Sequence, residues 1–290
     1  MLEPQKVLHL HIEEKKKKPQ INYDYLMLEK LDGWYVYIDY ISGTWHYPRS
    51  SAGRIIPSFQ WMRDEGFLDK HIKPLPIDCR FIVEATIDGK LFHEANGLFN
   101  RSKGDCSCRD VIFNFHDLVP LRAENNHYRN SERYWMLQDE IQFLSEQFRL
   151  IPLLGVSSNK NTWYNVADKI WDRGGEGLIL KRANDVYHPG KRNASMLKIK
   201  LEEEFDLLCV NMYTTIGEKG NENLNLDLKN LKGIVVPVRI GKYSDIAEFE
   251  RSSPIGKVVQ IRAMCQLEDG SYREPRFVGV RYDKKQSEID

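Results

Sequence analysis

The sequence predicts an α+β domain of antiparallel sheets with helices over residues 1–201, followed by a β-barrel of the OB-fold type over residues 202–290. Three observations predict this division. The length of 290 residues fits one large domain or two smaller ones. Strand and helix patterns mix in the first part, whereas only strand patterns follow. The acidic stretch 201–206 lies between the two parts and is expected to be a hinge.

Composition excludes several classes of protein. The hydrophobic share of 41% is enough for a sizeable core, which argues against disorder. No apolar stretch approaches the roughly 20 residues that span a bilayer, and the N-terminus lacks the apolar segment of a signal peptide, so no membrane partner is expected. Five unevenly spaced cysteines predict a reducing compartment, the cytoplasm, rather than a disulfide framework. The 42 basic and 42 acidic residues balance, which is compatible with a local basic groove.

The first forty residues predict a strand and a hairpin. His9 and His11 alternate as in a strand, and the run Lys15–Lys18 before Pro19 is expected to be a solvated turn, with a tail that touches DNA as the alternative. Strands are predicted at Tyr25–Lys30 and 34–40, with Asp32-Gly33 as the turn of a β-hairpin between them.

The rest of the first domain mixes strands with two helices. Further strands are predicted at 81–87, 111–115, 177–181 and 196–200, with Asp88-Gly89 as a second hairpin turn. The helical spacing of apolar residues predicts a helix over 131–150, with Ser131 as its N-cap, and the residues expected on its buried face are Leu137, Ile141, Leu144 and Phe148. A second helix over 162–172 presents Trp163, Val166 and Ile170 on one face and ends at Gly174-Gly175.

The second domain is predicted from four strands at 205–210, 234–240, 257–267 and 272–282. Apolar residues alternate cleanly through the third of them, from Val259 to Leu267. Several strands within about 90 residues, with glycine-rich turns, suit a small Greek-key barrel.

Four short motifs carry reactive or charged side chains. The first is Glu29-Lys30-Leu31-Asp32-Gly33, in which Lys30 and Asp32 share one face of a strand. The others are Glu176-Gly-Leu-Ile-Leu-Lys181, in which the strand period places Glu176 and Lys181 on opposite faces, then Lys198-Ile-Lys200, and the segment 275–284. Taken singly and in the order given, the four motifs are typical of a hairpin turn, of a buried strand with charged ends, of an exposed strand face and of a basic terminus.

Together and in this order, the motifs resemble those of the covalent nucleotidyltransferases, namely the ATP-dependent DNA ligases, RNA ligases and mRNA capping enzymes. The resemblance covers nearly the whole chain and is closest to the small two-domain DNA ligases of bacteriophages and viruses, which share runs similar to Val186-Tyr-His-Pro-Gly-Lys-Arg-Asn and to the segment 269–281. It implies an ATP-grasp-like adenylation (nucleotidyltransferase) domain over 1–201 and an OB-fold domain over 202–290.

The resemblance also implies roles for single residues. Lys30 would attack the α-phosphorus of ATP to form lysyl-AMP, and Asp32 would contact the nick or the ribose. Lys198 and Lys200 would bind the α-phosphate and stabilise the charge that develops during transfer. The remaining residues implied to bind the nucleotide are Glu29, Glu84, Phe115, Glu176, Lys181, Arg281, Asp283 and Lys284. Among these, Phe115 would stack on adenine, Glu84 and Glu176 would hold Mg²⁺ or Mn²⁺, and the last three would orient the pyrophosphate.

Two arginines of the family pattern are absent. Tyr35 stands where the first motif has arginine, and Ser50-Ser51-Ala52-Gly53-Arg54 lacks the arginine of the next motif, so Arg49 or Arg54 is expected to compensate. Six lysines and arginines against one acidic residue between positions 181 and 200 predict a surface for nucleic acid that includes Lys191 and Arg192, with an ordinary basic loop as the alternative. Residues 214–232 are a candidate for an inserted loop that encircles duplex DNA.

The expected function is that of an ATP-dependent DNA ligase that acts on nicked double-stranded DNA as a monomer, in the host cytoplasm if it is phage-encoded. ATP is favoured over NAD⁺ because 29 residues precede Lys30, too few for a nicotinamide-recognition domain. The alternatives are an RNA ligase or capping enzyme, and a catalytically inactive two-domain protein that binds nucleic acid. The spacing of Cys106, Cys108, Cys79 and His116 matches no standard zinc site.

Overall fold

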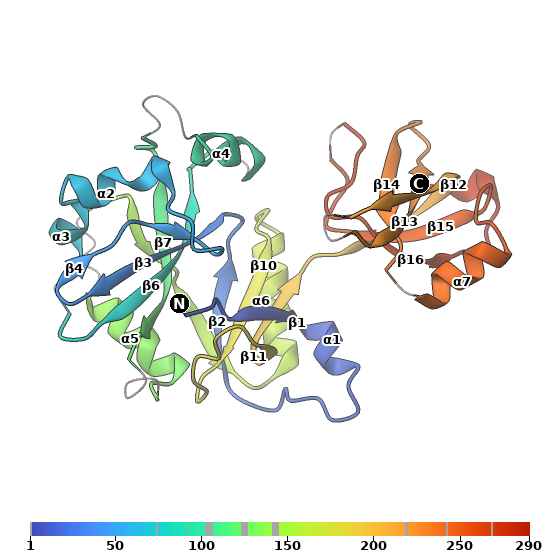
Figure 1. Cartoon of the computed structure of the whole chain (residues 1–290). Coiled ribbons are helices and arrows are strands. Elements are labelled where there is room, and N and C mark those ends of the chain that lie inside the picture. Colours follow the sequence, from blue (N-terminus) through green and yellow to red (C-terminus); the bar gives the residue numbers. More distant parts are fainter. Residues whose placement is uncertain are drawn as a thin grey trace. The chain divides into compact units, whose positions relative to one another are not determined.

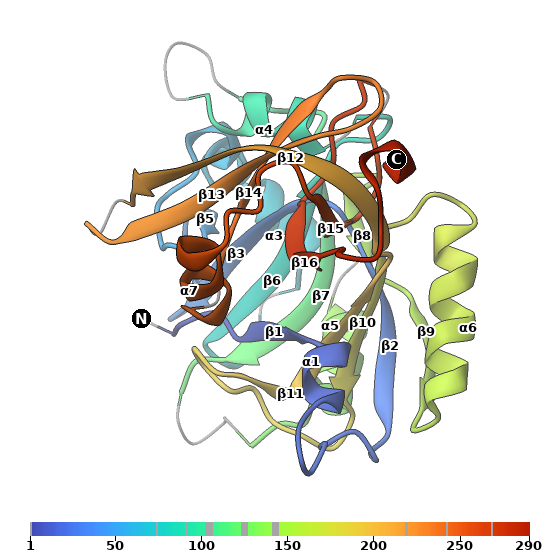
Figure 2. The same ribbon diagram turned by 90° about the vertical axis from the view of Figure 1, so that its right-hand side faces the viewer.

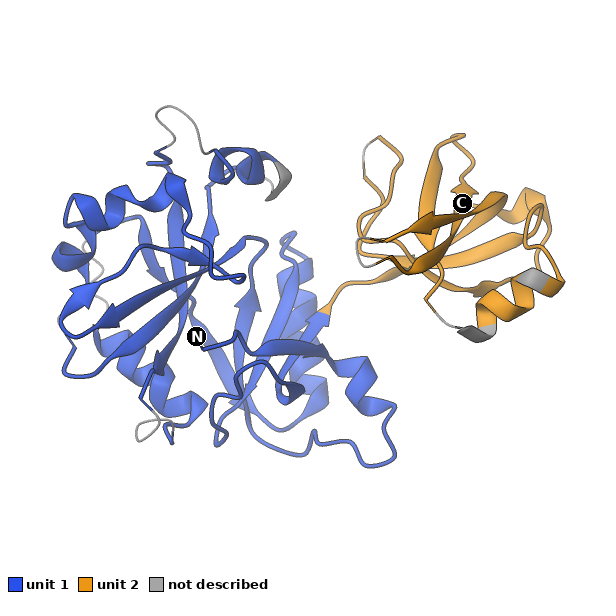
Figure 3. Cartoon of the chain, viewed as in Figure 1, with its two compact units in different colours: residues 1–199 blue, residues 200–290 orange. Residues whose placement is uncertain are grey.

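The structure, a computed structural model, describes residues 2–73, 75–90, 92–101, 107–122, 127–140, 145–217, 220–241, 243–267 and 269–290. The chain divides into two compact units, Met1–Ile199 and Lys200–Asp290 (Figure 3). Each unit has its own sheets and its own apolar core. The mixed α+β class that the sequence predicts is confirmed.

Unit 1 contains two sheets (Figure 1). The first has the strand order β1-β11-β10-β2-β9 and consists of β1 (Lys6–His9), β2 (Tyr25–Lys30), β9 (Leu153–Ser157), β10 (Gly177–Arg182) and β11 (Arg192–Lys200). The second has the order β4-β3-β6-β7-β8, with β5 paired to β3, and consists of β3 (Trp34–Ile41), β4 (Thr44–Trp45), β5 (Arg49–Ser50), β6 (Cys79–Thr86), β7 (Ile112–Pro120) and β8 (Phe148–Leu150).

The helices of unit 1 are α1 (Leu10–Glu14), α2 (Trp61–Asp64), α3 (Phe67–His71), α4 (Phe92–Phe99), α5 (Asn130–Glu140) and α6 (Lys160–Trp171). Helix α6 packs on β9 and β10 (Figure 2) and buries Trp163 and Ile170 against the first sheet. The Asn159 side chain caps its N-terminus, and Gly174 follows its end with φ of 81°. The predicted helix over 162–172 is therefore confirmed. No helix among the described residues is long and apolar enough to cross a membrane.

The predicted hairpin over residues 25–40 is wrong. Strand β2 pairs with β9 and β10 in the first sheet, whereas β3 pairs with β6 in the second. The turn Leu31–Gly33 therefore crosses from one sheet to the other. The crossing is tight, since a Cβ atom on Gly33 would lie 2.6 Å from the carbonyl oxygen of Ala85.

Replacing Gly33 by alanine is expected to destabilise unit 1 by about 1–3 kcal/mol, because the added methyl group collides with the β6 backbone, which cannot move aside. The measurement is the urea midpoint of unfolding. Gly97→Ala is the matched control, because Gly97 is an exposed helical glycine with open space around it and alanine is the better helix former. If Gly33→Ala and Gly97→Ala were equally stable, the close approach of Gly33 to the β6 backbone would be contradicted.

Other expected elements of unit 1 also need correction. Helix α5 ends at Glu140, and Phe148 is buried in the short strand β8; Ile141 and Leu144 lie outside the described residues. Ser131 is inside α5, where its hydroxyl donates to the carbonyl of Ala183 instead of capping the helix. His11 lies in α1, so only His9 is in the predicted strand, and Asp88-Gly89 precedes α4 rather than a second strand. The run Lys15–Lys18 is an exposed turn, as predicted.

Unit 2 is one antiparallel sheet in the order β14-β13-β12-β15-β16, with its edge strands β14 and β16 in contact with each other. Its elements are β12 (Glu203–Ile216), β13 (Glu222–Lys229), β14 (Val235–Arg239), α7 (Tyr243–Arg251), β15 (Val258–Ala263) and β16 (Arg276–Val280). Phe249 of α7 packs on Phe277 of β16 and covers the core.

Three features of unit 2 differ from expectation. The predicted inserted loop 214–232 is the end of β12 and all of β13, which pair as a hairpin from Leu208 opposite Lys229 to Ile216 opposite Glu222. Helix α7 lies where no helix was predicted. The expected long strands 257–267 and 272–282 are shorter in the structure, where they correspond to β15 and β16.

Candidate active site

A pocket lies between the two sheets of unit 1. It contains about 710 Å³ of space, including its open mouth. Its lining residues are Gln5, Val7, Leu28, Glu29, Lys30, Leu31, Tyr35, Ile82, Glu84, His116, Asp117, Ile151, Ile179, Lys181, Tyr187 and Met196. Strands β1, β2, β10 and β11 of the first sheet and β3, β6 and β7 of the second contribute to it. Apolar walls with a few convergent polar groups are typical of a small-molecule site.

Lys30 brings an amine to this pocket, and Glu176 is the counter-ion of Lys30. Gly177 of β10 lies opposite Lys30 of β2, so Glu176, one residue earlier, reaches the end of the same side chain. Lys30 Nζ lies 2.5 Å from Glu176 Oε2, and the carboxylate is only 4% exposed. Lys181 also lines this pocket, where it pairs with Asp117 rather than with Glu176.

Glu84 brings a second carboxyl group to the pocket. Burial raises the pKa of Glu84 to about 7, and the nearby Glu176 adds to the increase, while Lys30 and the Gly33 N–H oppose it. A further cation beside Glu84 and Glu176 would therefore favour the ionised form of Glu84. Two carboxylates combined with phosphate oxygens suit Mg²⁺, which keeps few protein ligands. No cluster of three or more potential metal ligands occurs in the part of the chain that the structure describes.

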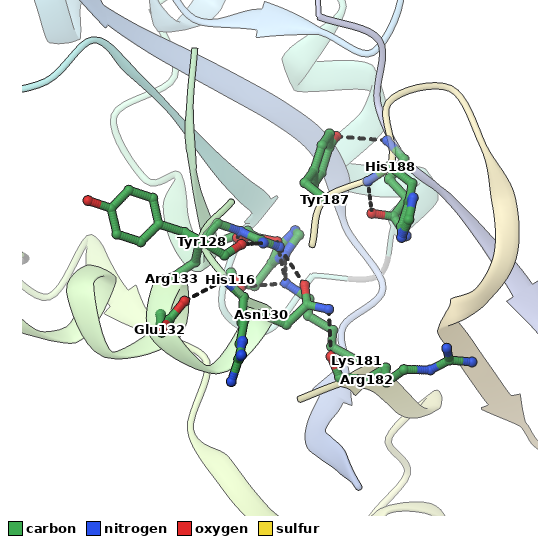
Figure 4. Close-up of polar contacts among 12 residues, drawn as sticks. His116, Tyr128, Asn130, Glu132, Arg133, Lys181, Arg182, Tyr187 and His188 are labelled. Carbon is green, nitrogen blue, oxygen red and sulfur yellow. Dashed lines mark hydrogen bonds and ion pairs between the residues drawn. The ribbon is translucent and has the colours of Figure 1, made fainter. Parts of the chain in front are cut away.

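A buried ion cluster lies at the wall formed by β7 and β10 (Figure 4). Asp117 is 2.8 Å from Arg133 Nε and 3.0 Å from Lys181 Nζ, and all three side chains are at most 3% exposed. The two cations hold the pKa of Asp117 well below its usual range despite burial. Burial lowers the pKa of Lys181, and Asp117 opposes that change.

Of the two neighbouring ring side chains on β7, His116 and not Phe115 lines the pocket. Phe115 is fully buried on the other face of β7, where its ring packs against Phe81 and Phe148. Between Phe115 and Asp117 the register with β6 shifts by one residue, which is a β-bulge at His116. The bulge turns both His116 and Asp117 toward the pocket. The expected contact between Phe115 and adenine is therefore wrong.

Residues 65–200 match the family described as ATP dependent DNA ligase domain. This segment of the chain is therefore similar to the ATP-dependent DNA ligase domain. Among curated proteins, it is 27% identical over 150 residues to a DNA ligase of Thermococcus onnurineus and 32% identical over 145 residues to a DNA ligase of Thermococcus fumicolans. These matches cover 42% and 40% of the chain, which spans only 27% and 26% of the two relatives.

Solved ligase structures share the fold. A structure named Pmar-Lig_Pre. has a TM-score of 0.79 at 20% identity, over 97% of this chain and 68% of that one. A Lig E DNA ligase has a TM-score of 0.73 at 19% identity, over 97% of this chain and all of the other. The ATP-dependent DNA ligase of bacteriophage T7, in complex with ATP, has a TM-score of 0.53 at 17% identity, over 96% and 98% of the two chains.

The residues expected to bind nucleic acid differ in their burial and in their contacts. Tyr35 lines the pocket, and burial raises its pKa, so it does not face solvent as an arginine that grips DNA would. Arg49 donates to the carbonyl of Gly53, 2.8 Å away. Arg54, Lys191 and Arg192 are exposed.

Three residues expected to be catalytic are absent from the lining of the pocket among the described residues: Asp32, Lys198 and Lys200. Asp32 is half-buried in the turn that follows Lys30. Lys200 belongs to unit 2, where its Nζ lies 3.4 Å from Glu274. Glu29 does line the pocket and also pairs with Arg173.

The three cofactor residues expected near the C-terminus form an ion network within unit 2. Arg281 binds Asp283 at 2.9 and 2.7 Å, and it also lies 3.3 Å from Asp206. Lys284 Nζ lies 2.5 Å from the same Asp206 carboxylate, which is 7% exposed. Sequence reasoning did not assign a role to Asp206, which the pattern placed in the acidic hinge.

Two of the cysteines considered for zinc are buried. Cys79 and Cys108 are buried as free thiols, and burial raises their pKa values. Cys106 lies outside the described residues.

Proposed function

We propose that this chain is an ATP-dependent DNA ligase that seals nicks between a 5′-phosphate and a 3′-hydroxyl. The observation that carries the proposal is the Lys30–Glu176 pair at the pocket between the two sheets, in a chain that matches the ligase domain. Both curated relatives are DNA ligases, which supports the proposal.

In the first step Lys30 acts as the nucleophile. Its Nζ atom loses a proton to solvent and attacks the α-phosphorus of ATP, while the Glu176 carboxylate, 2.5 Å away, orients the amine. The new N–P bond forms while the bond to the β-phosphate oxygen breaks, so lysyl-AMP and pyrophosphate result. In the second step the 5′-phosphate of the nick takes the AMP, and in the third the 3′-hydroxyl displaces it.

Glu84 and Glu176 are proposed to hold Mg²⁺ or Mn²⁺ together with the phosphates. The raised pKa of Glu84, about 7, supports this role, since a carboxyl group that lacks sufficient positive charge around it gains from a cation. The metal, when bound, neutralises charge on the phosphate oxygens. The residues of the chain position the phosphates and supply the nucleophile.

His116 replaces Phe115 in the proposal as the ring beside the base. Glu29, which lines the pocket, is proposed to bind the nucleotide, and Asp32 the nick or the ribose. Unit 2 is proposed to be an OB-fold domain, which five antiparallel strands with contacting edges support. Residues proposed to contact phosphates of the nucleotide or of DNA are Arg49, Arg54, Lys191, Arg192, Lys198 and Lys200.

The test is sealing of a nicked duplex with ATP and Mg²⁺. We expect a DNA nick to be sealed and ATP to be required. Sealing only of RNA strands would instead identify an RNA ligase, and labelling by GTP in place of ATP would identify a capping enzyme. Binding of the duplex without any transfer of AMP would identify an inactive nucleic-acid-binding protein.

The C-terminal ion network gives a prediction that separates the reaction steps. Arg281, Asp283 and Lys284 are proposed to orient the β- and γ-phosphates, which leave after the first step, with Asp283 acting through its ion pair with Arg281. Binding energy that is used in one transition state affects only that step. Asp283→Ala or Lys284→Ala should therefore slow self-adenylation about tenfold or more, yet leave sealing of a nick that already carries 5′-AMP unchanged. Lys232→Ala, at an exposed lysine of unit 2, is the control. Equal losses of rate in both assays would show that this segment does not act at the nucleotide site.

A further inference from the structure

Lys181 lines the pocket but has no free donor to offer a ligand. Its Nζ atom lies 2.7 Å from the carbonyl oxygen of His116, 3.0 Å from Asp117 Oδ2 and 3.3 Å from His116 Nδ1. A lysine ammonium has three N–H donors, and these three acceptors use all of them. In this arrangement Lys181 has no donor left for the nucleotide contact that the sequence predicted, so we propose another role for it.

The same lysine holds His116 at two points, the backbone carbonyl and the ring. An ammonium group only donates, so the contact at Nδ1 requires that this ring nitrogen accept. A neutral imidazole that accepts at Nδ1 carries its proton on Nε2. Burial, together with the charge of Lys181, lowers the pKa of His116 to about 3, so the ring stays neutral.

Arg133 holds in place Asp117, which is the ion-pair partner of Lys181. It binds both oxygens of Asp117, at 2.8 and 3.2 Å, and donates to the carbonyl of Tyr128 at 2.8 Å and to the side chain of Asn130. A chain of polar contacts, Arg133–Asp117–Lys181–His116, thus runs from α5 to the pocket, and Figure 4 shows Arg133, Lys181 and His116 converging. Buried and fully satisfied networks of this kind hold their members in one arrangement.

We infer that Lys181 is a positioning residue that fixes His116 as the Nε2–H tautomer, so that the pocket presents a neutral aromatic ring with a single N–H donor to the base of a nucleotide. The identity of the ligand rests on the proposed function, whereas the state of His116 does not. The charged groups that act on His116 are Lys181 of β10, Asp117 of its own strand and Lys30 of β2, and Arg133 of α5 acts through Asp117.

The direct test is ¹⁵N NMR of the histidine side chains in the full-length protein, with the His116→Phe variant used to assign the signal. We expect the Nε2–H form of His116 and no titration between pH 5 and 8. In Lys181→Met the fixed tautomer should be lost, and the pKa of His116 should rise by about one unit or more, because a cation is removed while Asp117 stays. Lys169→Met, at an exposed lysine of α6, is the control and should change neither. An Nδ1–H tautomer in the wild type would overturn the inference, and this result does not need Lys181→Met to fold.

A double-mutant cycle tests whether Lys181 affects the transfer of AMP through His116. A phenyl ring has no tautomer to fix, so Lys181→Met should reduce the rate of AMP transfer at least fivefold in the wild type and far less in a His116→Phe background. Equal losses in both backgrounds would show that Lys181 acts only on the fold and would overturn its role through His116. If the wild type itself transferred no AMP, the proposed function would fail while the NMR result would still stand.

Discussion

Replacing Lys30 by alanine is expected to abolish transfer of labelled AMP from α-labelled ATP to the protein. The variant lacks the nitrogen atom that forms the bond to phosphorus, and the described residues place no other lysine amine in the pocket with free donors, since Lys181 uses its three. The expected loss is complete within the limit of detection. The measurement is label retained on the denatured protein.

Two further variants make this result specific. Lys30→Arg keeps a cation beside Glu176 and so preserves the ion pair, yet a guanidinium does not lose its proton, so it should be equally inactive. Lys169→Ala, at an exposed lysine outside the pocket, should transfer AMP normally. Retention of label by Lys30→Arg would show that the nucleophile lies elsewhere.

Replacing Asp117 by asparagine is expected to produce the largest loss of stability, about 3–5 kcal/mol in the free energy of unfolding. The change leaves Arg133 and Lys181, both at most 3% exposed, without their counter-ion. Asp88→Asn is the matched control, because Asp88 forms a similar two-point contact with Arg149 in an exposed pair, 67% and 45% exposed. Solvent screens such a pair, so its loss should cost less than about 1 kcal/mol.

The same variant has a defined dependence on pH. The folded pKa of Asp117 is lowered, so its contribution to stability is fully present above the unfolded value of about 3.9 and is lost as the pH falls through the folded pKa. The difference in stability between wild type and Asp117→Asn should therefore be constant from pH 5 to 8 and should shrink below about pH 4. A difference that already shrinks near pH 6 would contradict an ionised Asp117 in a buried cluster.

Much of the fold could be predicted from local patterns, but the pairing of strands could not. The strands at Tyr25–Lys30 and 34–40 were predicted at nearly their true bounds, yet the tight turn between them gave no sign that they enter different sheets. That outcome depends on partners about forty residues away or more, β6 for one strand and β10 for the other. The missed strand β13 did carry a signal, since Leu224, Leu226 and Leu228 alternate with polar residues.

The candidate site was predicted in outline from its charged motifs. Lys30, Glu84 and Glu176 come together although they are far apart in the sequence. Phe115 was misassigned because an aromatic residue was expected to face the base, whereas the alternation of Phe113 and Phe115 already places both on one face of the strand. The bulge that turns His116 and Asp117 to the same side is a property of pairing with β6, which the sequence of β7 alone does not reveal.

The identity of the nucleophile is tested most directly by mapping the AMP adduct. The protein is incubated with ATP and Mg²⁺, digested, and analysed by mass spectrometry for the peptide that carries AMP. We expect a single adduct on Lys30, held by an acid-labile N–P bond and lost on addition of pyrophosphate, which reverses the first step. An adduct on any other residue, or one that resists acid as a phosphate ester does, would contradict it.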